Sequence, residues 1–422
     1  MIAGAALIAT FVLAAVLMWR RMLPALLAVP LVALLAGIVS GVHPQQLLQA
    51  IGEGTSGRIA PAYAAVIFGA LLGRVTMRTG IAEYLVSRAA EFGGDRPYAV
   101  VVSVGVAVAA LFTTLTGLGA IVMVGGIALP VMLSVGVRRE TAACAFLMFF
   151  ALGATFNVAL WTLYGGIVGA STAAFATLAP PVFVAAALAL AAFLLMSARR
   201  ERGFARLALD DPFASVAPEV PWPALIAPVL PLILILAFRW GAWGPVPAFL
   251  IAAVYAAVIV RPRDAVQTLV SSAVRGIEDV APAVFLMMGI GMLLAVAALP
   301  QVHDALAPIV ARIAPRHAVT YAMLFGLLSP LALYRGPLNP VGVGVAIFAV
   351  LAQQGALPPL ALAAAVLAVV QVQNVCDPTN TQNVWVANQV GVDVETITKR
   401  TLSFQTGVAI AVAAGAAWAF HL

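Results

Sequence analysis

Residues 370–383 read Val-Gln-Val-Gln-Asn-Val-Cys-Asp-Pro-Thr-Asn-Thr-Gln-Asn and concentrate polar groups inside an apolar part of the chain. They follow 360–370, which is almost entirely Ala, Val and Leu, and precede the apolar residues 384–386. This pattern predicts a membrane-spanning helix with a polar, Pro-containing break. Backbone freed from hydrogen bonding at membrane depth is tolerated only where protein or a water-filled cavity covers it. Secondary transporters place substrates and ions at such breaks, so the pattern favours a transporter.

The composition predicts an all-α polytopic membrane protein. The chain is 64% hydrophobic and 9% charged, whereas soluble domains carry about 25% charged residues. Apolar stretches long enough for spans recur throughout, for example at 2–18, 23–38, 182–196, 224–237, 249–260, 283–299 and 403–420. The net charge of +6 comes from basic residues near helix ends, which is typical of membrane orientation signals and does not indicate nucleic-acid binding.

The order of features predicts two inverted repeats, 1–221 and 222–422, at an offset of roughly 220 residues. Each repeat is expected to hold scaffold spans, a re-entrant hairpin (about 98–137 and 318–353) and a broken helix (about 141–170 and 358–392). This gives about 10 full spans plus two hairpins. With the N-terminus outside, 17 of the 22 basic residues fall on the cytoplasmic side.

The first hairpin tip and the first break supply neutral polar groups. Thr114 and Thr116 with Gly117 and Gly119 are candidate substrate-binding residues at the tip, although small residues also serve close helix packing. At the break, Asn157 is a candidate substrate ligand and Thr155 a candidate for ion coupling. Both also fit simple hydrogen bonds to a neighbouring helix.

The second hairpin tip indicates the charge of the substrate. Arg335 is isolated in an apolar segment, and its fork of donors suits a carboxylate or phosphate. Gly336 and Asn339 complete the predicted anion site at this tip. The alternative is that Arg335 pairs with Asp377 or extends to the membrane surface.

The second break contains Asp377, which is costly at membrane depth unless it is paired, bound to a metal or protonated. Its predicted roles are proton acceptor, Na⁺ ligand or partner of Arg335, and an N-cap role is also compatible. Thr379 and Asn380 are candidate substrate ligands, and Thr381 joins Asp377 in ion coupling. Asp377 and Asn380 are also the candidate Na⁺ ligands, and no other cofactor is expected.

Sequence motifs do not predict an enzyme. The chain contains no HExxH, P-loop, GxSxG or CxxC motif, and its four histidines are scattered without metal-ligand spacing. ATP-driven transport is therefore not encoded in this chain.

The order of spans, hairpin and broken helix, repeated once, resembles the ion transporter superfamily of elevator-type carriers. Residues 114–125, Thr-Leu-Thr-Gly-Leu-Gly-Ala-Ile-Val-Met-Val-Gly, look like the bacterial citrate, gluconate and related organic-anion permeases. The resemblance implies a homodimer in which the hairpins and broken helices move against a scaffold of early spans. It also implies coupling to H⁺ or Na⁺. Both tips lack the Ser-Asn-Thr of the sodium–dicarboxylate branch.

These observations predict a multi-pass protein of the bacterial inner membrane that moves a small organic anion, a carboxylate in particular. Symport with H⁺ or Na⁺ by an elevator-type mechanism is the leading hypothesis. The alternative is a Na⁺/H⁺ or other cation/proton antiporter of the same fold, in which Asp377 binds the cation and Arg335 is its resting partner.

Overall fold

The computed structural model describes residues 2–20, 22–57, 59–94, 96–201, 219–237, 244–355 and 357–422, and these ranges contain helices and no strand. The predicted connection between the two halves, 197–221, lies largely at 202–218, outside the described residues. The helices of the first half are α1 (Ile2–Trp19), α2 (Ala25–Val39), α3 (Pro44–Ser56), α4 (Ala60–Arg78), α5 (Ile81–Gly93), α6 (Pro97–Phe112), α7 (Leu118–Ser134), α8 (Arg139–Ala154), α9 (Val158–Val168) and α10 (Thr172–Arg200).

The second half is also helical and includes two short irregular segments near its centre. Its elements are η1 (Trp222–Ile226), α11 (Leu230–Ala237), α12 (Val246–Val260), α13 (Ala265–Ala297), α14 (Pro300–Ile313), α15 (Ala318–Ala322), η3 (Met323–Leu327), η4 (Ser329–Arg335), α16 (Gly344–Gln354), α17 (Pro359–Cys376), α18 (Thr381–Val390) and α19 (Val394–Ala419).

The apolar helices are those of a multi-pass membrane protein. Within the described residues, six helical stretches are long and apolar enough to cross a membrane, or seven if the bent pair α8 and α9 is one span. The axes of that pair differ by 68°. Several shorter apolar helices, including α6, α7 and α16, accompany them. Ala, Val, Leu and Ile dominate these segments, which suits them to an apolar environment. In such an environment a helix satisfies its backbone N–H and C=O groups internally, without water.

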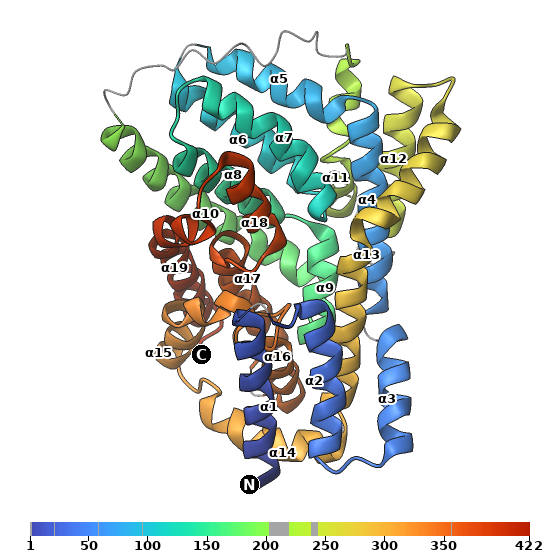
Figure 1. The fold of residues 1–422 in the computed structure, drawn as a ribbon, viewed down its shortest axis with the longest axis vertical. Coiled ribbons are helices and arrows are strands. Elements are labelled where there is room, and N and C mark those ends of the chain that lie inside the picture. The colour runs from blue at the N-terminus through green and yellow to red at the C-terminus, as the bar shows by residue number, and fades with distance from the viewer. Residues whose placement is uncertain are drawn as a thin grey trace.

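Two amphipathic helices lie at opposite ends of the molecule. In Figure 1, α5 crosses the top and α14 crosses the bottom. Along α14, Val302, Leu306 and Val310 recur at intervals of four and are buried, so one face of the helix packs on the protein. The pair α6 and α7 follows α5, whereas the segment from α15 to α16 follows α14, so these two segments start from opposite ends.

One group of helices packs around α13, which contacts α2, α3 and α4. The crossing of α3 and α13 depends on two glycines that bring the backbones together. A Cβ at Gly54 would lie 2.7 Å from the carbonyl oxygen of Gly291, and a Cβ at Gly291 would overlap the carbonyl oxygen of Gly54. Small residues permit this close approach in membrane proteins.

A second group packs around α17, which contacts α8, α10 and α19. Every residue from Ala361 to Cys376 is buried. The sequence of α17 is apolar on all sides, which is the pattern of a fully buried helix. Its polar C-terminal turn and the break that follows therefore lie inside the protein and not against lipid.

The α3–α13 crossing provides a stability test. Gly54→Val would push a branched side chain into the α13 backbone, and overpacking of this kind costs about 1–3 kcal/mol. Gly52→Val on the same helix is the matched control, because a Cβ there meets nothing within 4 Å. In detergent, G54V is expected to unfold at a clearly lower temperature than G52V. Equal melting midpoints would contradict the close crossing.

Candidate functional site

The carboxylate of Asp377 joins the second break to the turn between η4 and α16, which is the predicted tip of the second hairpin. The residue is fully buried directly after the end of α17. One oxygen, Oδ1, accepts from the backbone N–H of Tyr334 at 3.0 Å, the N–H of Thr379 at 2.9 Å and the hydroxyl of Thr379 at 2.7 Å. The other, Oδ2, accepts from the N–H of Arg335 and from Nδ2 of Asn339, both at 3.3 Å. Five donors thus satisfy the buried charge.

The hairpin tip adopts an uncommon backbone that aims its N–H groups at this carboxylate. Tyr334 and Arg335 have φ values of 55° and 57°, in the left-handed region that non-glycine residues seldom occupy. Successive N–H groups in such a turn form a concave anion site, and Asp377 occupies it. At the next residue, Gly336, a Cβ would overlap the carbonyl oxygen of Leu331. Left-handed non-glycine residues cost about 1–3 kcal/mol each, which the carboxylate offsets here.

The guanidinium of Arg335 does not take part in this network. Asp377 is bonded to the backbone of Arg335, while the side-chain Nη1 donates to the carbonyl oxygen of Val341 at 3.2 Å. Among the described residues, no carboxylate oxygen lies within 4.0 Å of the guanidinium nitrogens. Asp377 is nevertheless the largest electrostatic influence on the guanidinium, and Tyr164 of α9 is also near it. Most of the five guanidinium donors are therefore not used by the described protein groups.

Asn339 is buried and holds the shape of the tip. Its Nδ2 donates to the carbonyl oxygen of Ala332 at 2.9 Å as well as to Asp377, and its Oδ1 accepts from the N–H of Val341 at 2.9 Å. The side chain predicted to bind substrate is occupied by the protein in this conformation.

The predicted Na⁺ ligands are also hydrogen-bonded. Asn380 donates through Nδ2 to the carbonyl oxygen of Gln373 at 2.6 Å, and its Oδ1 accepts from Nε2 of Gln373 at 3.1 Å. Because N–H and O–H donors already surround the oxygens of Asp377 and Asn380, this pair does not fit a cation here. Thr381, predicted to help in ion coupling, is exposed at the start of α18. The described residues also hold no group of three or more His, Cys, Asp or Glu suited to a metal.

Asn157 connects the first break to the first hairpin tip. It is buried, and its Nδ2 donates to the carbonyl oxygens of Phe112 and Leu115, both at 3.1 Å. Its Oδ1 caps α9 by accepting from the N–H groups of Ala159 at 3.1 Å and Leu160 at 3.3 Å. All four hydrogen-bonding positions of the amide are used, which matches the helix-bonding alternative for this residue.

Asn157 and Asp377 each bind the backbone of a hairpin tip, the first as a hydrogen-bond donor and the second as an acceptor. They are 220 residues apart (377 − 157), which is the offset expected between the two halves. Each follows the first helix of a broken pair and binds the backbone of its own hairpin tip. Asn157 donates to carbonyl oxygens, whereas Asp377 accepts from N–H groups.

Thr155 links the first break to α17. Its hydroxyl donates to the carbonyl oxygen of Ala151 at 3.0 Å and accepts from Nε2 of Gln371 at 3.1 Å. Its carbonyl oxygen accepts from the indole of Trp161 at 2.9 Å. The bond to Gln371 therefore links the first break to α17, the helix that precedes the second break.

Three buried amide oxygens around the second break have no hydrogen-bond partner among the described residues: Oε1 of Gln371, Oε1 of Gln373 and Oδ1 of Asn383. Buried polar atoms are nearly always paired, so such atoms point to a missing donor. The sequence shows these residues in the polar segment. Only the structure shows that their oxygens lack a partner. In each amide the N–H₂ group donates to a neighbouring residue.

The first hairpin tip rests against α4, α13 and the segment before α11. Thr114 is buried, and its hydroxyl donates to the carbonyl oxygen of Pro228 at 2.7 Å. Gly117 has a φ of 87°, and a Cβ there would lie 3.0 Å from Val280 of α13. The hydroxyl of Thr116 is buried without a partner and lines a cavity of about 10 Å³, close to the space that one water requires.

An ion pair that the sequence analysis missed lies beside this tip. Arg74 of α4 donates through Nε and Nη2 to both carboxylate oxygens of Asp279 of α13, and its Nη1 contacts the sulfur of Met123 at 3.4 Å. Gly119 packs so closely that a Cβ would lie 2.5 Å from the carboxyl carbon of Asp279. The two charges are 205 residues apart, and each alone reads as an ordinary interfacial residue.

No family model and no curated protein matches the chain. Its fold resembles solved structures that include the YdaH transporter of Alcanivorax borkumensis, described as having an unusual topology. The TM-score is 0.57 at 16% identity, and the match covers 88% of this chain and 86% of that chain. At this identity the likeness shows the fold alone.

The carboxylate network at the second tip predicts a specific effect of Asp377→Asn. One amide oxygen can replace Oδ1, but the amide N–H₂ would face the donors of Arg335 and Asn339. A buried donor left unpaired costs about 1–3 kcal/mol. We expect D377N to unfold at lower temperature in detergent and to exchange the tip amide hydrogens faster. Asp393→Asn, at the exposed N-cap of α19, is the control and should change neither. Unchanged protection of the tip amides in D377N would contradict the network.

Proposed function

We propose that this protein is a secondary active transporter that moves a small organic anion, a carboxylate in particular, across the bacterial inner membrane. The observation that carries the proposal is the guanidinium of Arg335, which lies at a hairpin tip with no carboxylate of the described residues within 4.0 Å. A planar fork of donors at membrane depth suits an oxyanion. The fold likeness to a transporter supports the same class of function.

Two inverted repeats are part of this proposal. In both halves, two apolar helices precede a long helical stretch, which is α3 with α4 in the first half and α13 in the second. An amphipathic helix, a pair of helical segments, two consecutive helices and a last long helix follow in each, which supports the proposed repeat. The positions of α5 and α14 at opposite ends of the molecule support an inverted arrangement (Figure 1). Inverted repeats supply two accessibilities of one central site.

We propose an elevator mechanism in a homodimer with its N-terminus outside. The helices around α13 would form the scaffold, and the hairpins and broken helices would form the moving part. Asn157 and Asp377 support this division, because each fastens a tip to its break and makes the two move together. The first tip touches α4 and α13 mainly through side chains and glycine contacts, which suits a sliding interface.

The proposed substrate site lies between the second tip and the first broken helix. Arg335 supplies the charge, and Tyr164 from α9 lies within electrostatic range of it. The unpartnered amide oxygen of Gln371 lies on the helix that binds Thr155 of the first break.

The first test measures uptake of labelled citrate, gluconate, C4-dicarboxylates and monocarboxylates into proteoliposomes under imposed Na⁺ or pH gradients. Arg335→Gln should reduce uptake of the transported acid by about tenfold or more, because the positive charge that binds the acid is lost. Arg335→Lys should retain part of the uptake. Arg312→Gln, on α14, is the matched control and should transport normally. If R335Q binds and transports every acid as the wild type does, the anion site is wrong. Proton flux driven by Na⁺ without any acid would favour the antiporter.

A second test addresses the moving interface. A Cβ at Gly73 lies 3.1 Å from the side chain of Leu115, so Gly73→Cys with Leu115→Cys permits cross-linking of α4 to the first tip. In a background without the two native cysteines, Hg²⁺ should stop uptake by this pair, and a thiol should restore it. Gly289→Cys with Pro30→Cys joins α13 to α2 inside the proposed scaffold and should leave uptake intact. Full activity of the cross-linked tip would rule out the elevator movement.

A further inference from the structure

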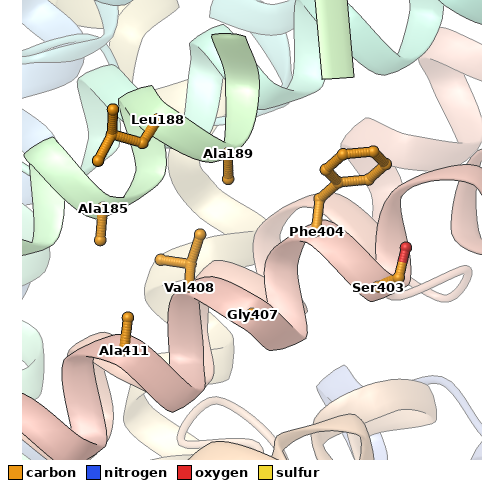
Figure 2. Close-up of a pocket in the computed structure, with 8 residues that line it drawn as sticks. All are labelled: Ala185, Leu188, Ala189, Ser403, Phe404, Gly407, Val408 and Ala411. Carbon is orange, nitrogen blue, oxygen red and sulfur yellow. The ribbon is translucent and has the colours of Figure 1, made fainter. Parts of the chain in front are cut away.

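An apolar groove lies between α10 and α19, away from the hairpins. Its volume is about 400 Å³, within the range of about 300–1,000 Å³ typical of ligand sites. Figure 2 shows α10 contributing one wall and α19 the other. The lining residues are Ala185, Leu188, Ala189, Ser403, Phe404, Gly407, Val408 and Ala411.

The floor of the groove is left open by a glycine. A Cβ at Gly407 would meet nothing within 4 Å, so no packing reason in the described chain requires glycine there. At one end, Phe404 of α19 packs edge-on against Phe193 of α10 with 5.5 Å between ring centroids. Leu188, on the outer wall, is 67% exposed. The groove therefore opens sideways, toward the lipid that surrounds these two apolar helices.

Basic side chains continue both walls beyond that end. On α19, Lys399, Ser403, Gly407 and Ala411 recur every four residues and share one stripe, so Lys399 lies about 6 Å along the axis from Ser403. On α10, Arg199 and Arg200 follow Leu188 and Ala189 by eleven residues, which is three turns, and so share their stripes. The two helices run in opposite directions and present these cations at the same end.

The cations are available to a ligand. Arg199, Arg200 and Lys399 are exposed, and none has a carboxylate oxygen within 4.0 Å among the described residues. The nearby acids are engaged or turned away. Glu201 accepts from Tyr98 and Thr141, and Glu140 lies 3.9 Å from Arg400. Glu395 is exposed and shares the stripe of Lys399, one turn farther from the groove than Lys399.

We propose that this groove binds an anionic phospholipid of the phosphatidylglycerol type. One acyl chain would lie between α10 and α19 over Gly407, and the phosphate would lie at Lys399 and the two arginines. An apolar channel that ends in unpaired cations matches an amphiphile whose charge is at one end. Basic pockets between membrane helices bind anionic head groups in this way. A zwitterionic lipid would fill the channel equally well but would lose the net attraction to the cations.

The test uses the full-length protein in mild detergent, with phosphatidylglycerol and phosphatidylcholine of identical chains added separately. Native mass spectrometry counts retained lipid, and thermal melting measures stabilisation. Phosphatidylglycerol should bind more tightly, and Lys399→Gln should weaken it about fivefold while leaving phosphatidylcholine unchanged. Arg199→Gln with Arg200→Gln should weaken it further.

A second pair of variants separates the groove from the charges. Gly407→Phe places a ring in the groove from a position whose Cβ meets nothing within 4 Å, and it should abolish the preference for phosphatidylglycerol. Gly415→Phe, on the same helix at a position that is also open, should bind lipid normally. Equal affinity for both lipids, or undiminished phosphatidylglycerol binding in G407F, would overturn the proposal. A change of oligomeric state in G407F without a change in lipid binding would assign the groove to a second copy of the chain instead.

Discussion

The structure depends on how it satisfies backbone groups that a helix break releases inside the membrane. A break at this depth is stable only when protein side chains replace the lost hydrogen bonds. Asn157 and Asp377 provide these bonds, and each also takes hold of a hairpin tip. Because one side chain serves both elements, a tip and its break form one mechanical unit. The division into a moving part and a scaffold, as proposed, starts from these two residues.

The difference between the two anchors follows from how each hairpin ends its first arm. α6 ends as a regular helix, which leaves carbonyl oxygens without partners, and the amide N–H₂ of Asn157 satisfies two of them. The corresponding arm in the second half ends in the left-handed turn at Tyr334 and Arg335, which exposes N–H groups. Donors reach both oxygens of Asp377, and a carboxylate supplies two acceptor oxygens where the amide of an asparagine supplies one.

The sequence showed where the breaks lie but not what their residues bind. Polar density inside an apolar run is visible in the sequence alone, and it singled out Asp377 and Arg335 as unusual for an apolar segment. An ion pair between them was one alternative to anion binding, whereas the carboxylate binds the backbone of Arg335 and the guanidinium donates to Val341. Backbone N–H groups are invisible to residue patterns, because every residue carries one. Likewise, Arg74 and Asp279 meet only through the crossing of α4 and α13.

Under the proposed coupling of transport to an ion, the network at Asp377 also bears on which ion is used. A Na⁺ ion needs several oxygens turned toward it, and here donors occupy both oxygens of Asp377 and the side-chain oxygen of Asn380. A proton on Asp377 requires a smaller rearrangement, because it takes one acceptor position of the carboxylate and displaces one of the five donors. The Oδ2 side, with two bonds of 3.3 Å to Arg335 and Asn339, holds its donors less tightly than Oδ1. Protonation there would loosen the tip that carries Arg335, so proton binding and access to the anion site would share the same hydrogen bonds.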